Sequence, residues 1–296
     1  MRLKKVFALT TAVVMAMSFV TGCGSAKQGK EVEFDKSYEI TVISREEGSG
    51  TRGAFIELLG IEQKDENGEK RDYTTVDAVT MNNTSGVMQT VAGDEYAIGY
   101  VSLGSLNDTV KALKIDGAEA TEENIKNGTY KVARPFNIAT KSEISEATQD
   151  FINFILSTEG QEIVSEKGYI SLDETTDYQG MQVSGQIVVA GSTSVTPVME
   201  KLKEAYIARN PKVDIQIQTN DSSTGISMAI EGTCDIGMAS RELKDSEISQ
   251  GLIGTVIATD GIAVIVNQVN TLENIASEDV KSIYVGDVYT WDEIIK

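Results

Sequence analysis

Histidine is absent from this 296-residue sequence, and cysteine occurs only twice. Without histidine, the chain can form neither a Ser-His or Cys-His catalytic pair nor a histidine-based zinc site. The sequence also lacks the Ser-x-x-Lys motif and the Walker A motif of phosphate-binding loops. These classes of catalytic, metal and nucleotide sites are therefore excluded.

The first cysteine follows a segment that is typical of a secretory signal. Residues 1–22 combine three basic residues near the start with an apolar run over 6–20. The Thr-Gly pair before Cys23 resembles the lipobox of bacterial lipoproteins, in which the cysteine becomes the lipidated first residue. An ordinary signal or one N-terminal membrane helix is the alternative, but the apolar run is short for a membrane span. The second cysteine, Cys234, then has no partner, and we expect it to be a small buried residue.

Beyond the signal, no apolar stretch approaches membrane-spanning length, so we expect a soluble, tethered body. Residues 23–36 are polar and predict a flexible tether. Acidic residues outnumber basic ones and give a formal net charge of −19, which becomes −22 when the three basic residues of the signal are removed. This excess argues against a nucleic-acid partner. It also means that any anion site must act through local donors, against the net field.

One such set of donors is predicted in the segment Ser44–Arg52. It follows a strand-like run over 38–43 and begins a segment with apolar residues at helical spacing. The unpaired N–H groups of a helix start suit a bound anion, as do the hydroxyls of Ser49 and Thr51. Arg45 adds a planar fork of donors that fits a tetrahedral oxyanion. The alternative is a capped helix with a surface arginine.

Strand-like and helix-like segments alternate along the whole chain, which predicts an α/β fold with mostly parallel sheets. Three later strands also end in Ser/Thr/Gly-rich turns, and their turns lie at 191–194, 220–225 and 240–241. Further helices are expected over 84–92, 143–157, 161–166, 226–230 and 242–250. Four turns of this kind favour a shared oxyanion site at the carboxyl ends of the strands.

Four motifs make the resemblance specific: Arg45–Thr51, Ala190–Pro197, Asp221–Ile226 and Asp235–Arg241. They resemble the binding-site motifs of the phosphate-binding proteins that serve ABC phosphate importers. These PstS-like proteins have the type II periplasmic-binding-protein fold. The similarity extends over nearly everything from Tyr38 onward.

The order of these motifs differs from that of the family. There the Gly-Ser-Thr motif comes first, and the Arg-x-x-Gly-Ser-Gly-Thr motif follows a tryptophan-containing segment near the middle of the chain. Here the second half comes first, which resembles a circular permutation. Residues 171–185 would then join the ends of the conventional chain. Permutation is tolerated where the old ends lie close together, so we expect residues 291–296 to lie beside residues 37–40.

The resemblance implies a two-lobed α/β fold with mixed sheets and a hinge between the lobes. One lobe would comprise residues 37–133 and 260–296, and the other residues 134–259. The phosphate-binding residues that it implies are Arg45, Glu47, Ser49, Gly50, Thr51, Thr193, Ser194, Ser222, Ser240 and Arg241.

Glu47 stands where the family usually has aspartate. A carboxylate there would accept the proton of hydrogen phosphate and repel sulfate, which lacks that proton. The longer glutamate side chain leaves this geometry open, and a solvated loop carboxylate is the alternative. The role of Arg241 is also open, because some family members have aspartate at that position.

The resemblance also implies what the protein works with. It implies stoichiometric binding without catalysis, with no cofactor and no metal. Phosphate would be handed to the permease and ATPase subunits of an ABC importer by a monomer that is anchored through Cys23 to the outer face of the bacterial cell membrane.

Two other interpretations remain. The segment from Gly48 to Gly53 satisfies G-x-G-x-x-G after a strand, as in dinucleotide-binding domains. Such a domain needs a second strand that ends in an acidic residue about twenty positions later, but the sequence around Asp72 is rich in charged and turn-forming residues. The other interpretation is a site for a different oxyanion, such as sulfate or molybdate.

Overall fold

The computed structural model describes residues 34–295. The predicted signal peptide, Cys23 and the predicted tether up to residue 33 lie outside the described residues. The folded body already includes Phe34, whose ring centroid lies 5.4 Å from that of Tyr96 and 6.1 Å from that of Trp291. Within residues 34–295, no helix combines the length and the apolar character that crossing a bilayer requires.

In the first half of the chain, the strands and helices are β1 (Thr41–Arg45), α1 (Gly50–Leu58), β2 (Glu62–Lys64), β3 (Lys70–Asp72), β4 (Val79–Met81), α2 (Thr84–Gly93), β5 (Ala97–Ser102), the 3-10 helix η1 (Leu103–Ser105), β6 (Lys111–Ala112), β7 (Lys114–Ile115), α3 (Glu122–Lys126) and β8 (Ala133–Lys141). In the second half they are α4 (Glu146–Ile155), α5 (Thr158–Glu166), β9 (Gly185–Ser192), α6 (Thr196–Arg209), β10 (Val213–Asn220), α7 (Ser222–Glu231), β11 (Ile236–Ala239), α8 (Asp245–Ile248), β12 (Leu252–Val266), β13 (Asn274–Ile275), α9 (Ser277–Val285) and the 3-10 helix η2 (Trp291–Glu293).

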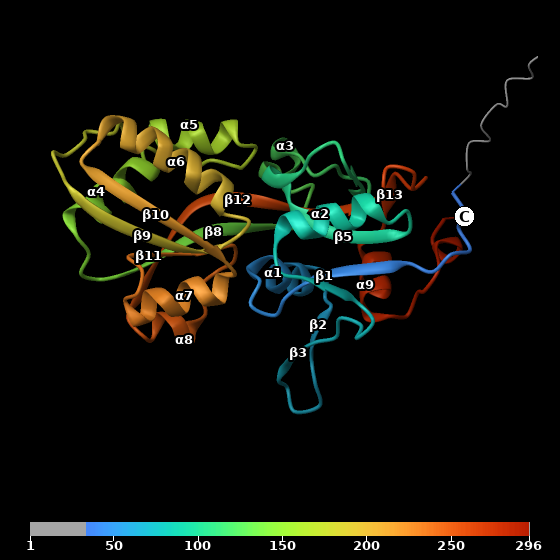
Figure 1. Ribbon diagram of the computed structural model, residues 1–296. Coiled ribbons are helices and arrows are strands. Elements are labelled where there is room, and N and C mark those ends of the chain that lie inside the picture. Colours follow the sequence, from blue (N-terminus) through green and yellow to red (C-terminus); the bar gives the residue numbers. More distant parts are fainter. Residues whose placement is uncertain (1–33, 296) are drawn as a thin grey trace, which may run out of the picture. The chain divides into compact units, whose positions relative to one another are not determined.

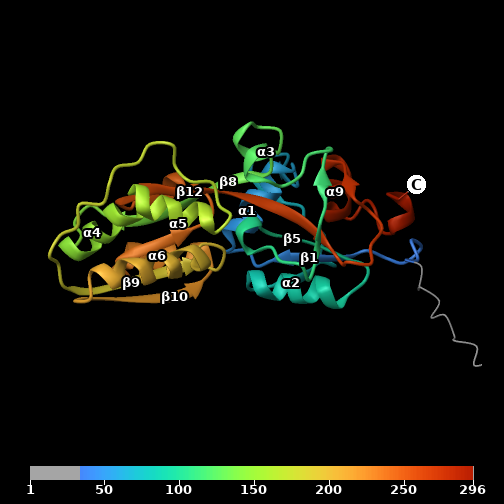
Figure 2. The same ribbon diagram turned by 90° about the horizontal axis from the view of Figure 1, so that it is seen from above.

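The main sheet runs in the order β10-β9-β11-β8-β12-β5-β1-β4. Pairs within each end of this sheet are parallel, as in β1 with β4 and β9 with β10, whereas β8 and β12 pair in antiparallel fashion. β8 and β12 lie side by side and connect the two ends of the molecule (Figures 1 and 2). The predicted α/β class with mixed sheets is confirmed.

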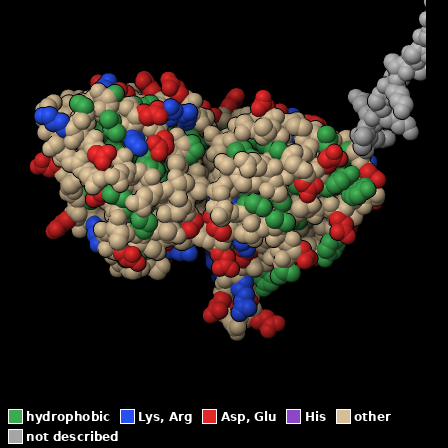
Figure 3. Space-filling model, in the orientation of Figure 1, with side chains coloured by type: hydrophobic (Ala, Val, Ile, Leu, Met, Phe, Trp, Pro, Cys, Tyr) green, Lys and Arg blue, Asp and Glu red, His purple; other side chains and the backbone are tan. Residues whose placement is uncertain are grey.

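The hydrophobic core is divided at these two long strands. Before β8, Val132 packs in one core cluster, and Phe136 within β8 packs in another. Along β12, Ala258 belongs to the second cluster and Ile262 to the first. Figure 3 shows a waist in the molecular surface between the two masses. We use lobes of residues 37–133 plus 260–296 and of residues 134–259 as a proposal that fits this division.

Capping residues explain where the helices differ from the predicted ranges. The helix expected to begin at residue 226 begins at Ser222, because the Asp221 carboxylate accepts a hydrogen bond from the Thr224 N–H group at 2.8 Å. The predicted helix over 242–250 is only the short α8.

The expected neighbourhood of residues 37–40 and 291–296 is confirmed for the residues that the structure describes. Glu39 and Thr290 form an antiparallel bridge. Trp291 is fully buried in the same core that contains the first strands. The C-terminal segment therefore packs in the same lobe as the first described residues.

Candidate functional site

Four helices begin where the two halves of the molecule meet. α1 and α2 follow β1 and β4, and α6 and α7 follow β9 and β10. β1 and β4 are parallel to each other, as are β9 and β10, so the carboxyl ends of each pair lie together. The antiparallel pairings of β11 with β8, β8 with β12 and β12 with β5 make the two pairs run in opposite directions. The starts of helices carry free N–H groups and a positive partial charge, so the junction where these helices begin suits an anion.

Hydroxyl side chains line this junction, and most of them are buried. Those that are at most 5% exposed are Ser49, Thr51, Thr84, Ser192, Ser194, Ser222 and Ser240. Hydroxyls are neutral donors that can also accept, so a cluster of them stays satisfied by internal hydrogen bonds and can still turn its protons toward an anion.

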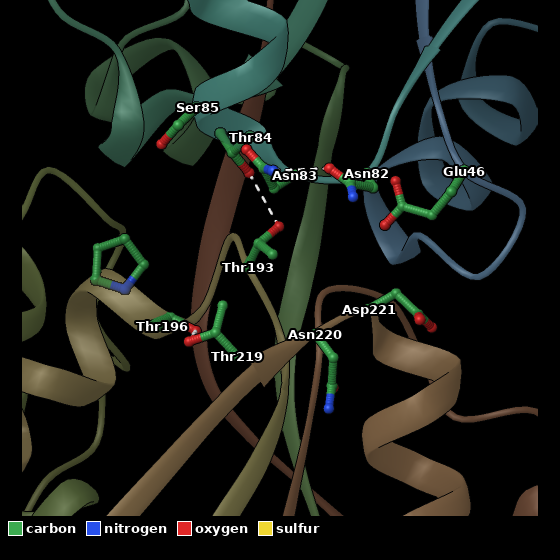
Figure 4. A pocket seen from close by; sticks show the side chains of 11 residues that line it. Glu46, Asn82, Asn83, Thr84, Ser85, Thr193, Thr196, Thr219, Asn220 and Asp221 are labelled. Carbon is green, nitrogen blue, oxygen red and sulfur yellow. Dashed lines mark hydrogen bonds between the residues drawn. The ribbon is translucent and has the colours of Figure 1, made fainter.

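The junction has two walls: the starts of α1 and α2 form one, and the starts of α6 and α7 with the turn after β9 form the other. The two walls are in direct contact through these hydroxyls. Thr51 and Ser194 share a hydrogen bond of 2.9 Å. Thr84 lies 3.2 Å from the hydroxyl of Thr193 and 3.3 Å from that of Ser194. Figure 4 shows the first of these two contacts crossing from α2 to the turn after β9.

Gly50 lies where the walls are closest. A Cβ atom at this position would lie 2.5 Å from the hydroxyl oxygen of Ser222 and 2.7 Å from that of Ser240. Ser222 in turn accepts a hydrogen bond from the Ser240 N–H group at 3.1 Å. Glycine is therefore required at position 50 for this close approach of backbone to side chains.

Arg45 supplies the positive charge of the junction and is only 2% exposed. Its Nη2 donates to the Thr193 hydroxyl at 3.2 Å, and its Nη1 donates to Thr84 at 3.4 Å. Tyr100 holds the Arg45 backbone in place, because the Arg45 N–H group donates to the Tyr100 hydroxyl at 3.1 Å. Burial raises the pKa of Tyr100, so this hydroxyl remains neutral.

Glu46 occupies the other edge of the guanidinium. Its two carboxylate oxygens accept from Arg45 Nε at 2.8 Å and from Arg45 Nη2 at 2.7 Å. The Glu46 carboxylate thus accepts hydrogen bonds from donors of Arg45 that the sequence analysis assigned to an oxyanion.

A cavity of about 650 Å³ opens beside this pair. All the residues that line it except Pro197 have polar or charged side chains, and they are Glu46, Asn82, Asn83, Thr84, Ser85, Thr193, Thr196, Pro197, Thr219, Asn220 and Asp221. Figure 4 shows Thr84 and Thr193 at its centre, with Glu46 to one side. Of the buried hydroxyl residues of the junction, Thr84 is the one that lines this cavity.

The structure does not bring Glu47 and Arg241 into this cluster. Glu47 is exposed and lines a second cavity with Ser49. Arg241 donates to both carboxylate oxygens of Glu247, at 2.8 and 2.9 Å, and lies 3.4 Å from the Ser223 hydroxyl. Both residues therefore stand at the margin of the junction.

The sequence reasoning missed three residues of the junction. Thr84 was predicted only as the start of a helix, although it follows a strand just as Ser49 does. Ser192 donates to the Ser240 hydroxyl at 3.0 Å and lies within the predicted turn. Glu46 directly follows Arg45. A buried arginine needs a carboxylate partner to balance its charge, and this requirement could have predicted the role of Glu46. Among residues 34–295, no group of three His, Cys, Asp or Glu side chains could hold a metal ion.

Comparison with known proteins agrees with this architecture. The PBP_like_2 profile, described as a PBP superfamily domain, matches residues 30–159 and 176–295. The chain is 52% identical over 289 residues to the phosphate-binding protein PstS 2 of Streptococcus agalactiae, and this alignment covers 97% of each chain. The chain belongs to the PstS family.

A second member of the PstS family, the phosphate-binding protein PstS 2 of Streptococcus pneumoniae, is 46% identical over 297 residues, which cover 99% of this chain and 100% of that one. A crystal structure of a phosphate-binding protein of a phosphate ABC transporter from Streptococcus pneumoniae TIGR4 is 48% identical. It has a TM-score of 0.69 and covers 86% of this chain and 99% of that one. The predicted periplasmic-binding-protein fold is therefore confirmed.

Proposed function

We propose that this protein is a solute-binding protein that captures inorganic phosphate between its two lobes and delivers it to an ABC importer. The observation that carries the proposal is the meeting of Arg45 with Thr193, at 3.2 Å, and of Thr51 with Ser194, at 2.9 Å. These contacts join distant parts of the chain into one buried, donor-rich point. The names of the PstS relatives support phosphate over sulfate or molybdate as the ligand.

Each predicted residue has a proposed role in this site. Ser49, Thr51, Thr193, Ser222 and Ser240 donate hydroxyl hydrogen bonds. Backbone N–H groups of Gly50 and Ser194 complete the cage, and Arg45 supplies charge. Glu47 and Arg241 act from the margin, where Glu47 is solvated and Arg241 is held by Glu247. This division follows from the burial of the first set, in which only Thr193 is partly exposed, and from the exposure or pairing of the second.

A site of this kind suits a small dianion in an acidic protein. The net charge of −19 creates a field that repels anions over the surface as a whole. Oriented hydroxyls and helix starts act over a few ångströms and are effective once water is excluded. The ligand must therefore be enclosed between the walls rather than bound on the surface, and hinge motion at β8 and β12 provides this enclosure.

We infer binding without catalysis, so that each captured ion is released unchanged. The permease and ATPase of an ABC importer receive it, and lipid on Cys23 anchors the protein to the outer face of the cell membrane. We propose a monomer without a nucleic-acid partner or a cofactor.

Isothermal titration with phosphate, sulfate and molybdate tests this function. We expect one phosphate per chain, bound more tightly than either of the other ions. Replacing Arg45 with methionine should weaken phosphate binding by at least about tenfold, since a hydrogen bond to a charged group contributes about 1.5–3 kcal/mol. The matched control is Arg209→Met. The Arg209 side chain is 52% exposed and pairs with Glu159, and both residues lie in the lobe that does not contain Arg45. Absence of phosphate binding by the unaltered protein would refute the function.

A further inference from the structure

A second arginine is buried near the proposed site, and it is paired with a carboxylate. Arg134 Nε and Nη2 both donate to one carboxylate oxygen of Asp260, at 3.2 and 3.0 Å. The other Asp260 oxygen accepts from the Ser102 hydroxyl at 2.8 Å. The side chains of Arg134 and Asp260 are 2% and 0% exposed. Such a pair is costly to bury, and replacing it by apolar residues is often neutral for stability. A role in ligand binding would explain why this costly pair is present.

The pair lies at the point where the hydrophobic core is divided. Arg134 on β8 and Asp260 on β12 are direct partners in the antiparallel ladder. On β8 the second core cluster begins at Phe136, and on β12 the first cluster resumes at Ile262. The guanidinium is thus fixed to the strands that connect the lobes, and it would keep its place if the lobes rotated about them.

One donor group of Arg134 is not used by this pair. Nε and Nη2 form one edge of the planar guanidinium, so Nη1 points away from Asp260. Among the described residues, Nη1 has no hydrogen-bond partner although it is buried. An unsatisfied buried donor is expensive, and in a binding protein its partner is expected to be a ligand atom.

The surroundings of Arg134 connect it to the proposed phosphate site. Arg134 lines the same cavity as Ser49, which caps α1. Burial lowers the pKa of Arg134, and the positive charge of Arg45 acts in the same direction. Tyr169 connects the wall that contains Ser194 to the Arg134–Asp260 pair. Its hydroxyl donates to the Ser194 carbonyl oxygen at 3.3 Å. Burial raises the Tyr169 pKa, and the negative charge of Asp260 raises it further.

Arg45 and Arg134 are therefore two buried like charges, and each is connected to the hydroxyl-lined junction by the contacts described above. A dianion between them would relieve their repulsion and satisfy the free donor. We propose that Arg134 is the second cationic residue of the anion site and that its Nη1 donates a hydrogen bond to the bound oxyanion. This inference rests on the proposed function and adds to it a charge that is fixed to the strands connecting the lobes.

The test removes both charges of the pair, because removing Arg134 alone would leave Asp260 buried and unpaired. Phosphate affinity is measured by isothermal titration for the unaltered protein and for Arg134→Met/Asp260→Asn, at about pH 8, where phosphate is mainly a dianion, and at about pH 6, where the monoanion gains weight. We expect the double variant to bind phosphate about tenfold to a hundredfold more weakly at about pH 8. The loss should be smaller at about pH 6, because a monoanion loses less when a cation is removed. The matched control is Arg209→Met/Glu159→Gln, which removes a much more exposed pair within residues 134–259 and should leave affinity unchanged.

Asp260→Asn provides a second variant that retains the guanidinium. It should bind phosphate as tightly as the unaltered protein or more tightly, because a negative charge near the anion has been removed. If the double variant does not fold, this single variant decides, and weaker binding by it overturns the proposal. An equal loss of affinity at both pH values in the double variant, or no loss, also overturns it and indicates a purely structural pair. Failure of the unaltered protein to bind phosphate would instead refute the proposed function itself.

Discussion

Arg45 and Glu46 are neighbours in sequence, and their side chains form a two-pronged ion pair with donor–acceptor distances of 2.8 and 2.7 Å. The pair neutralises an arginine that is only 2% exposed, and it fixes the plane of the guanidinium. The end of the guanidinium that carries Nη1 and Nη2 then faces Thr84 and Thr193. Glu46 thus sets the orientation of Arg45 and also reduces the positive charge available to an anion.

Glu46→Gln should therefore tighten phosphate binding. The amide oxygen still accepts from Arg45, while the negative charge beside the ligand is lost. A unit charge a few ångströms from a dianion near a protein surface is worth enough to change affinity by about tenfold. Isothermal titration at constant ionic strength measures this. Glu47→Gln is the control, and because Glu47 is exposed we expect little change in affinity or in selectivity against sulfate. A larger effect at Glu47 would restore its predicted role as proton acceptor.

Gly50→Ala should weaken phosphate binding strongly. Its methyl group would lie 2.5 Å from the Ser222 hydroxyl oxygen, so the two walls would be forced apart. Overpacking of this kind costs about 1–3 kcal/mol, which we expect to appear as a tenfold or greater loss of affinity. Gly53→Ala in the same helix is the control, because no atom lies within 4 Å of its added methyl group. It should be neutral or slightly stabilising, and equal losses from both variants would contradict the close approach at Gly50.

Thr84→Val tests a residue that the sequence did not single out. The change keeps the shape of the side chain but removes a hydroxyl that contacts Arg45, Thr193 and Ser194. Losing one such hydrogen bond costs about 0.5–1.5 kcal/mol, so phosphate affinity should fall about threefold to tenfold. Thr90→Val in the same helix is the control, since the Thr90 hydroxyl only donates to the Gly86 carbonyl oxygen and to a methionine sulfur. Unchanged titration curves for Thr84→Val would remove Thr84 from the site.

The Arg241–Glu247 pair should make stability depend on acid pH. Burial acts to raise the Glu247 pKa, but hydrogen bonds from the Arg241 side chain and the Lys244 N–H group outweigh it and lower the pKa below the ordinary value of 4.5. The pair's contribution is therefore complete above about pH 4.5 and is lost as the pH falls through the folded-state pKa. Glu247→Gln should reduce the free energy of unfolding by about 1–3 kcal/mol at pH 7.

Urea denaturation near pH 7 and near pH 3 measures this difference, which should shrink at the lower pH. Glu159→Gln removes a carboxylate from a more exposed pair and should cost at most about 1 kcal/mol. A difference for Glu247→Gln that is the same at both pH values would show that the carboxylate is not stabilised as a charged group.

The hypothesis of a circular permutation predicts that the chain can be rejoined. The Lys36 ammonium group donates to the Ile295 carbonyl oxygen at 3.2 Å, so a short Gly/Ser linker can connect these ends. Opening the chain between Gly180 and Met181, both exposed, would recreate the conventional order. We expect this protein to fold and to bind phosphate within about twofold of the original affinity. Circular dichroism and titration check this, and a matched opening inside β8 should not fold.

The sequence reasoning identified most strands and helices, because alternation and helical spacing report directly on which face of an element is buried. It also singled out Arg45, Thr51 and Ser194, and the structure brings these residues to one junction, where Thr51 and Ser194 share a hydrogen bond and Arg45 donates to the neighbouring Thr193. It placed α8 too broadly and missed the early start of α7. Helix ends depend on single capping bonds, such as that from Asp221, which a pattern of apolar residues does not reveal.

The sequence by itself determined the chemistry of the site: neutral hydroxyls, helix starts and arginine, with no histidine. Only the tertiary structure decided which of these groups meet. Thr84 and Ser194 are 110 positions apart, and Arg134 faces Asp260 only because two long strands pair across the molecule. Contacts of this kind arise from the packing of separate segments, whereas propensity and patterning act only on near neighbours along the chain.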